Sequence, residues 1–300
     1  MKRIWLLFFV VMQIFVLWGI YESAVVVGYS WRSLNWGPFF SMGNNISLSS
    51  PDYSEPYSKR FLGAKTIRLY DFVGNITVEY GDTNEIIFDG YKILSDRKKN
   101  MKLFNESYIS EEHYGDEVIL KWVQPKELSG KTGFNGTITI PLDTSNLVVD
   151  VPFGALDIYG GSGDLDVKAN FGAVNVDNHV GDLIVKADFG SVKLNNITPY
   201  NKVFVEASLG EIVYVGSLAK DSRFEADLGS VKLTLPPDSS AYIDAKVDLG
   251  SLNSDFPLSN TTTQGLGKIS VGVLGMETPI NKLYLRADLG SVDIKKAVMW

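Results

Sequence analysis

A glycine preceded by phenylalanine or leucine recurs through the second half of this chain. Successive glycines lie 18, 18, 20, 19, 21 and 40 residues apart. The last interval corresponds to two periods and contains a degenerate Leu274-Gly275 pair. The seven pairs are Phe153-Gly154, Phe171-Gly172, Phe189-Gly190, Leu209-Gly210, Leu228-Gly229, Leu249-Gly250 and Leu289-Gly290. A constant period of about 20 residues in strand-rich sequence is typical of stacked repeats.

Each repeat predicts two short strands joined at a glycine bend. In residues 164–171, apolar side chains alternate with polar ones up to Phe171, and Val174 resumes the apolar face after Gly172. Period-two alternation places Phe171 with Leu165 on the inward face. A single repeat has nothing to bury that face against, whereas repeats stacked at about 4.8 Å share one narrow core. We therefore predict an all-β, stacked-strand, β-solenoid-like domain whose glycines are structural bends.

The repeats also support a family resemblance. Residues 62–296 resemble the putative-adhesin or toast-rack domains of unknown function, which are found outside the membrane in bacterial and archaeal envelope proteins. The resemblance depends on strand–glycine–strand units such as 187–194 and 287–294, and on the strand Thr137-Ile138-Thr139-Ile140-Pro141 before the first repeat. It implies a solenoid-like stack and a role in envelope sensing, adhesion or scaffolding. It implies no catalytic residues.

The amino-terminal segment predicts a membrane anchor. Lys2 and Arg3 precede an apolar run over residues 4–21, and 18 helical residues span roughly 27 Å, enough to cross a bilayer. The basic residues before the span predict a cytoplasmic tail at 1–3 and an extracytoplasmic carboxyl-terminal domain on a single-pass cell-membrane protein. The alternatives are a signal peptide cleaved near Ala24 or Gly28 and a buried helix of a soluble protein.

The remaining boundaries follow from composition and strand patterning. Residues 22–60 are predicted as a juxtamembrane stalk, with a linker at 49–56. Its aromatic residues, Trp31, Trp36, Phe39 and Phe40, either lie at the lipid headgroups or cover the first open edge of the following domain. Residues 61–152 are predicted as the first β portion, 153–296 as the glycine-bend array, and 297–300 as a tail.

Composition excludes several classes of chemistry. The chain has no cysteine, two histidines and a net charge of −7. It therefore has no disulfide framework, no cysteine-ligated zinc or iron–sulfur cluster and no three-histidine metal centre. The negative charge argues against nucleic acid as a partner. We expect no cofactor, and we expect His113 and His179 to be solvated in polar turns.

A polar column precedes the bends. Carboxylates in turns usually bond to nearby backbone amides, and one carboxylate per rung is too few for calcium. We therefore predict backbone hydrogen bonding for this column and no metal site. Its members are Asn170, Asp188, Ser208, Asp227, Asp248 and Asp288.

The outward faces predict charge pairing and one interaction patch. Lys186 beside Glu206, and Glu225 beside Lys246, are expected to form ion pairs between rungs. The outward column also contains Lys168 and Arg286. Two positions earlier, Ile184 and Phe204 are neighbouring apolar residues that predict a small interaction patch. The alternative is packing under the loops at 195–202 or 215–222.

Six N-x-[ST] sequences lie beyond the predicted span and are candidate glycosylation sites. They are Asn45, Asn75, Asn105, Asn135, Asn196 and Asn260.

Three function classes remain. The favoured one is a membrane-anchored, non-catalytic ectodomain that binds an envelope protein or a surface polymer. The second is a structural subunit of a surface layer or polymer, because the ends of a solenoid expose unpaired strands and permit self-association. The third is a polysaccharide-processing β-helix enzyme, which would need carboxylates or arginines gathered in one groove.

Overall fold

The computed structural model describes residues 51–95, 101–275 and 279–298. These residues form twenty strands, with one short helix α2 (Met101–Asn105) and one 3-10 turn (Lys126–Leu128). The described part of the chain is therefore all-β and solenoid-like, as predicted. None of its helices is long and apolar enough to cross a membrane. The span predicted over 4–21 lies outside the described residues, as does the stalk up to residue 50.

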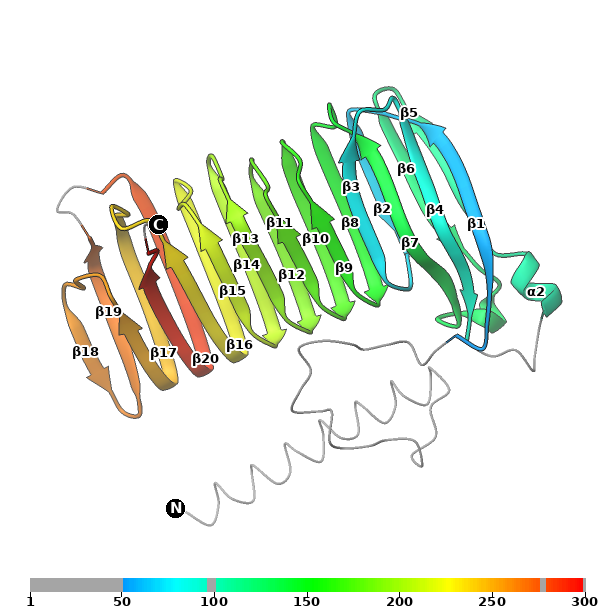
Figure 1. Cartoon of the computed structure of the whole chain (residues 1–300). Coiled ribbons are helices and arrows are strands. Elements are labelled where there is room, and N and C mark those ends of the chain that lie inside the picture. The colour runs from blue at the N-terminus through cyan, green and yellow to red at the C-terminus, as the bar shows by residue number, and fades with distance from the viewer. Residues whose placement is uncertain (1–50, 96–100, 276–278, 299–300) are drawn as a thin grey trace, which may run out of the picture. The chain divides into compact units, whose positions relative to one another are not determined.

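All twenty strands belong to one continuous sheet that folds into two layers facing one another across one main core (Figure 1), because three long strands pass through the bend from one layer to the other. We call these layers the first and the second sheet. In spatial order, the first sheet contains β5 (Tyr108–Tyr114), β6 (Glu117–Val123), β2 (Thr66–Tyr70), β8 (Asn146–Phe153), β10 (Asp164–Phe171), β12 (Leu183–Phe189), β14 (Lys202–Leu209), the first halves of β16 (Asp221–Leu235), β20 (Asn281–Lys296) and β17 (Ala241–Ser254), then β19 (Gly267–Leu274) and β18 (Thr261–Gln264). The second contains β1 (Tyr53–Leu62), β4 (Glu85–Leu94), β7 (Thr132–Pro141), β3 (Ile76–Gly81), β9 (Leu156–Tyr159), β11 (Val174–Asp177), β13 (Val192–Ile197), β15 (Ile212–Gly216) and the second halves of β16, β20 and β17.

Neighbouring rungs pair in parallel with their repeats in register. Ala169 lies beside Ala187, Ala187 beside Ala207, and Ala207 beside Ala226. These alanines are buried, and the Val167 column next to them is buried as well. In-register stacking therefore gives one continuous core that is thin near the bend, because each rung contributes a methyl group there.

The bend glycines form a column along one edge of the stack. A Cβ atom added to Gly172 would lie 1.6 Å from the carbonyl oxygen of Gly154, and one added to Gly190 would lie 1.8 Å from that of Gly172. Gly154 also has φ of +125°, which side chains rarely adopt. The close approach continues through Gly210, Gly229, Gly290 and Gly250, so none of these bends has room for a side chain.

The residue before each bend glycine lies at the corner rather than in the core. The Phe153 and Phe171 rings stack face to face with centroids 5.0 Å apart, and Phe171 and Phe189 do so at 4.8 Å. All three are partly exposed, and Phe189 reaches 36%. The inward placement predicted for Phe171 is wrong, because the bend turns that side chain out of the period-two alternation.

The last repeat is not the last rung. β20 pairs in parallel with β16 on one side and with β17 on the other, so it is inserted between them (Figure 1). The long interval before it contains the antiparallel β18–β19 hairpin, and Leu274-Gly275 ends β19 instead of forming a bend between the two sheets. The prediction of a degenerate rung in this interval is therefore wrong.

Antiparallel strands cover most of the sheet ends. β5 closes the first sheet at one end and β18 at the other, and β1 closes the second sheet beside β4. β1 begins at Tyr53, inside the segment predicted as a linker. Its alternation suffices for a strand, since the half-buried Tyr57 packs edge-on against Trp122 and Phe134.

Candidate binding surface

The outer face of the first sheet brings together apolar, aromatic and cationic side chains from adjacent rungs. Ile184 lies beside Phe204, Phe204 beside Arg223, and Arg223 beside Tyr284. Ile184, Phe204 and Tyr284 are half-buried and Arg223 is exposed. We call these four residues the Phe204 patch.

Two cations cover the aromatic rings of this patch. The Lys186 Nζ atom lies 5.1 Å from the centroid of the Phe204 ring, and the Arg223 guanidinium carbon lies 5.5 Å from it. That guanidinium also lies 4.7 Å from the Tyr284 ring. Each such contact contributes about 0.5–1 kcal/mol at an exposed site. Arg223 is therefore held between two rings with part of its guanidinium open to solvent.

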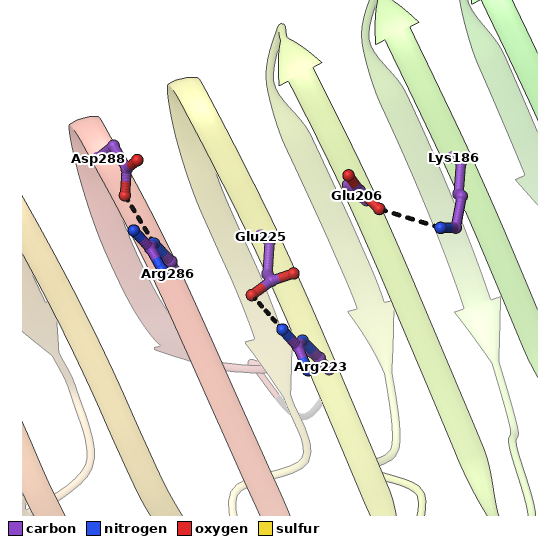
Figure 2. Close-up of polar contacts among 6 residues, drawn as sticks. All are labelled: Lys186, Glu206, Arg223, Glu225, Arg286 and Asp288. Carbon is purple, nitrogen blue, oxygen red and sulfur yellow. Dashed lines mark hydrogen bonds and ion pairs between the residues drawn. The ribbon is translucent and has the colours of Figure 1, made fainter.

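Carboxylates pair with the cations in and beside the patch, and Figure 2 shows the three ion pairs. Lys186 Nζ lies 3.3 Å from Glu206 Oε2 on the next rung, Arg223 Nη2 lies 2.7 Å from Glu225 Oε1, and Arg286 Nε lies 2.7 Å from Asp288 Oδ1. The Lys186–Glu206 pair confirms the sequence prediction. The prediction of a Glu225–Lys246 pair is wrong, because the inserted β20 places Arg286 between those residues.

The aspartates of the polar column before the bends hydrogen-bond or form ion pairs mainly with other side chains. Asp188 accepts a hydrogen bond from Asn170 at 3.0 Å, and Asp248 pairs with Lys246 at 2.8 Å. The predicted bonding to backbone amides is thus replaced by pairing along and between strands. Burial and the neighbouring carboxylates of Asp288 and Glu206 raise the pKa of Asp227. The described residues contain no group of three or more histidine, aspartate or glutamate side chains placed to hold a metal ion.

The two histidines differ in environment. His113 is exposed beside Glu111, with 2.7 Å between its Nε2 atom and the Glu111 carboxylate. His179 is buried, and its Nε2 atom lies 3.0 Å from the carbonyl oxygen of Gly163. Burial lowers the pKa of His179. The prediction of a solvated turn is wrong for His179, because stacked turns shield one another. His113 is solvated as predicted, but it lies in β5 rather than in a turn.

The candidate glycosylation residues also divide. Asn75, Asn105, Asn196 and Asn260 are exposed, and Asn135 is half-buried. The Asn135 side-chain oxygen accepts a hydrogen bond from the Asn75 amide at 2.7 Å, and the Asn75 oxygen accepts one from Ala155 at 3.3 Å. Asn196 donates to Asn178 at 2.6 Å. Asn45 lies outside the described residues.

Sequence reasoning missed Arg223 and Tyr284 as members of the patch. Tyr284 occupies the same position in its repeat as Phe204, two residues before the charged row. Aligning the repeats would have shown that equivalence. It would not have shown that Tyr284 lies beside Arg223, because 61 residues separate the two along the chain.

Comparisons with known proteins give distant structural similarities. No protein-family model matches the chain, and no curated protein matches it. A putative cell adhesion protein from Clostridium sporogenes is 13% identical with a TM-score of 0.35, over 81% of this chain and 100% of its own. A putative adhesin from Parabacteroides merdae is 11% identical with a TM-score of 0.33, over 81% of this chain and 97% of its own. A putative lipid binding protein from Parabacteroides distasonis is 11% identical with a TM-score of 0.24, over 82% of this chain and 98% of its own. At this level the similarities carry no argument about function.

Proposed function

We propose that this chain is a membrane-anchored, non-catalytic ectodomain that binds an envelope protein or a surface polymer through the Phe204 patch. The patch itself carries this proposal. It presents two aromatic rings and an arginine on three adjacent rungs, with half-buried Ile184 beside them. Aromatic residues and arginine are the side chains most enriched where proteins bind one another.

The fold supports binding rather than chemistry at this surface. Each rung is fixed by parallel pairing on both sides, so the patch is organised before a partner arrives. Its cations are already engaged with carboxylates two residues away or on the next rung. A catalytic groove would instead gather unpaired carboxylates, as glycoside hydrolysis requires.

The test is capture of native membranes and purified cell-wall polymer by the full chain in detergent. Phe204→Ser should reduce capture at least fivefold while the melting temperature changes little. Tyr242→Ser is the matched control, because Tyr242 is 53% exposed on the same sheet outside the patch. Unchanged capture by Phe204→Ser together with a lower melting temperature would assign the patch a structural role and contradict the proposal.

Anchoring through residues 4–21 is tested separately. The full chain should remain in the membrane fraction after alkaline carbonate extraction, and a chain beginning at residue 22 should be released. Release of both would contradict the anchor, and an amino terminus near residue 25 or 29 in the mature protein would indicate a cleaved signal.

A structural subunit of a surface layer is the second candidate. One observation favours it: in the described part of the chain, the second half of β17 pairs with β20 and with no strand on its other edge. Open edges can accept a strand from another copy. Light scattering in detergent distinguishes the candidates, because a monodisperse monomer contradicts polymerisation through this edge.

A further inference from the structure

The column of corner aromatics stops at Phe153. One face of its ring is covered by Phe171, with a centroid distance of 5.0 Å and an interplanar angle of 4°. Among the described residues no aromatic ring stacks on the other face. The next rung towards that face is β2–β3, which meets the Phe153 rung at the Val73–Phe153 bridge.

That next rung has an aromatic residue, but one position too early to continue the column. Phe72 is fully buried and stacks on Phe88, with centroids 5.7 Å apart and an interplanar angle of 18°. Val73 therefore occupies the corner before Gly74, where the rungs at Phe153, Phe171 and Phe189 have phenylalanine. Val73 is buried, and its side chain is smaller than a phenyl group, so it covers less of the Phe153 ring than a phenylalanine would.

A pocket of about 350 Å³ lies at this position. Its apolar walls include Val73, Trp122, Pro152 and Phe153. Its polar lining includes Asp71, Lys121, Gln124 and Ser129. The Lys121 Nζ atom pairs with the Asp71 carboxylate at 2.9 Å. Ligand pockets usually measure about 300–1,000 Å³, so this one suits a group of one or two rings.

We propose that this pocket binds a planar aromatic group that stacks on Phe153 as the next member of the column. The repeat of the stack places a ring there at the spacing that Phe153, Phe171 and Phe189 already use. The Asp71 carboxylate retains lone pairs beyond its bond to Lys121 and can accept an indole N–H or phenol O–H. The ligand class is thus a flat ring with one hydrogen-bond donor, and this site is separate from the Phe204 patch.

The first experiment compares a planar probe with a non-planar one on the full chain. Saturation-transfer NMR titrations use indole and cyclohexylmethanol, and we expect indole to bind at about millimolar Kd, which is typical of a small fragment. Cyclohexylmethanol should bind at least fivefold more weakly, because it cannot stack flat on Phe153. Equal binding of the two probes, or binding of neither, overturns the proposal.

Two variants place the bound ring in the column. Val73→Phe supplies the missing ring from the chain itself and should reduce indole binding at least tenfold. Phe153→Leu removes the stacking face and should weaken indole binding about two- to tenfold. Phe189→Leu is the matched control at the other end of the aromatic column and should leave indole binding unchanged. Full indole binding by Phe153→Leu contradicts stacking even where Val73→Phe fails to fold.

A further probe separates the two sources of such a ring. The capped tripeptide acetyl-Gly-Trp-Gly-amide should bind at least as tightly as indole where the natural ligand is an aromatic side chain of a protein. Binding of free indole with exclusion of the tripeptide assigns the pocket to a small aromatic molecule. Either result supports the ring site, and loss of both signals overturns it.

Discussion

The middle of the stack and the regions near its two ends contain the same kind of rung, but they differ in how the spatial order of the rungs relates to their order in the sequence. From β10 to β15 each rung contacts the rungs that precede and follow it in sequence. At one end β2–β3 lies between β6–β7 and β8–β9, and at the other β20 lies between β16 and β17. Repetition of the rung thus determines how strands stack, and it leaves open which rung becomes the neighbour.

The largest loss of stability should come from substituting the bend glycines. Gly172 tests the middle of the stack, and Gly290 tests the inserted strand β20. In Gly172→Ala the new Cβ would lie 1.6 Å from the Gly154 carbonyl oxygen, and in Gly290→Ala it would lie 1.6 Å from that of Gly229. We expect each to lower the free energy of unfolding by about 3–5 kcal/mol, measured by urea denaturation.

Gly115→Ala is the control for these two variants. Gly115 has φ of +62° in an open turn, where a Cβ meets nothing within 4 Å. This variant should lower the free energy of unfolding by about 1 kcal/mol, which is the strain of a left-handed residue alone. A cost this small for Gly290→Ala would contradict the insertion of β20.

The next effect tests whether β20 holds two rungs that are separate in sequence. Leu285 is fully buried and lies beside Phe224 of β16 and Ala245 of β17. Leu285→Ala should cost about 2–5 kcal/mol through the cavity it leaves. Hydrogen exchange should accelerate in both β16 and β17, while Val185→Ala in β12 should affect β10 and β14 instead. Acceleration in β17 alone after Leu285→Ala would indicate that β20 does not contact β16.

A smaller effect is the pH dependence of stability, which should differ between His179 in the stacked turns and His113 in β5 at the end of the first sheet. Burial lowers the folded-state pKa of His179, so the unfolded chain binds a proton on this histidine before the folded one does. Stability should therefore fall as pH drops below about 6.5, the ordinary value for histidine, and continue to fall until the folded-state pKa is passed. His179→Gln should flatten this dependence in urea denaturation at several pH values. His113→Gln is the control, because His113 is exposed in β5 at one end of the first sheet. An equal change in the pH dependence of the unfolding free energy for both variants would contradict the assignment to His179.

The smallest effect concerns ion pairs. A double-mutant cycle on Lys186 and Glu206, which join two rungs, should give a coupling of about 0.2–1 kcal/mol that weakens at high salt. The Arg286–Asp288 pair lies within one strand. A double-mutant cycle on it should give a smaller coupling than the Lys186–Glu206 cycle. A larger coupling for Arg286–Asp288 would reverse this comparison.

Residue patterning predicted much of the fold and two of the four residues of the Phe204 patch, Ile184 and Phe204. The alternation in residues 164–176 identified β10 and β11, and the bend glycines identified the corner. Prediction failed where a residue left the alternation, as Phe171 does at the bend, and where a distant strand was inserted, as Tyr284 is beside Arg223. The aromatic pocket was also missed, because it depends on Phe72 turning inward and leaving Val73 at the corner.

The amino-acid sequence by itself determined the rung: period-two apolar faces need a neighbouring layer, and only glycine fits where one backbone carbonyl meets the next bend. Tertiary structure alone decided the order of the rungs. Backbone hydrogen-bonding edges are the same in every strand, and the apolar columns of β16, β17 and β20 match one another in register. Closing a longer loop costs little extra entropy, so the chain can return a late strand to an earlier place in the stack.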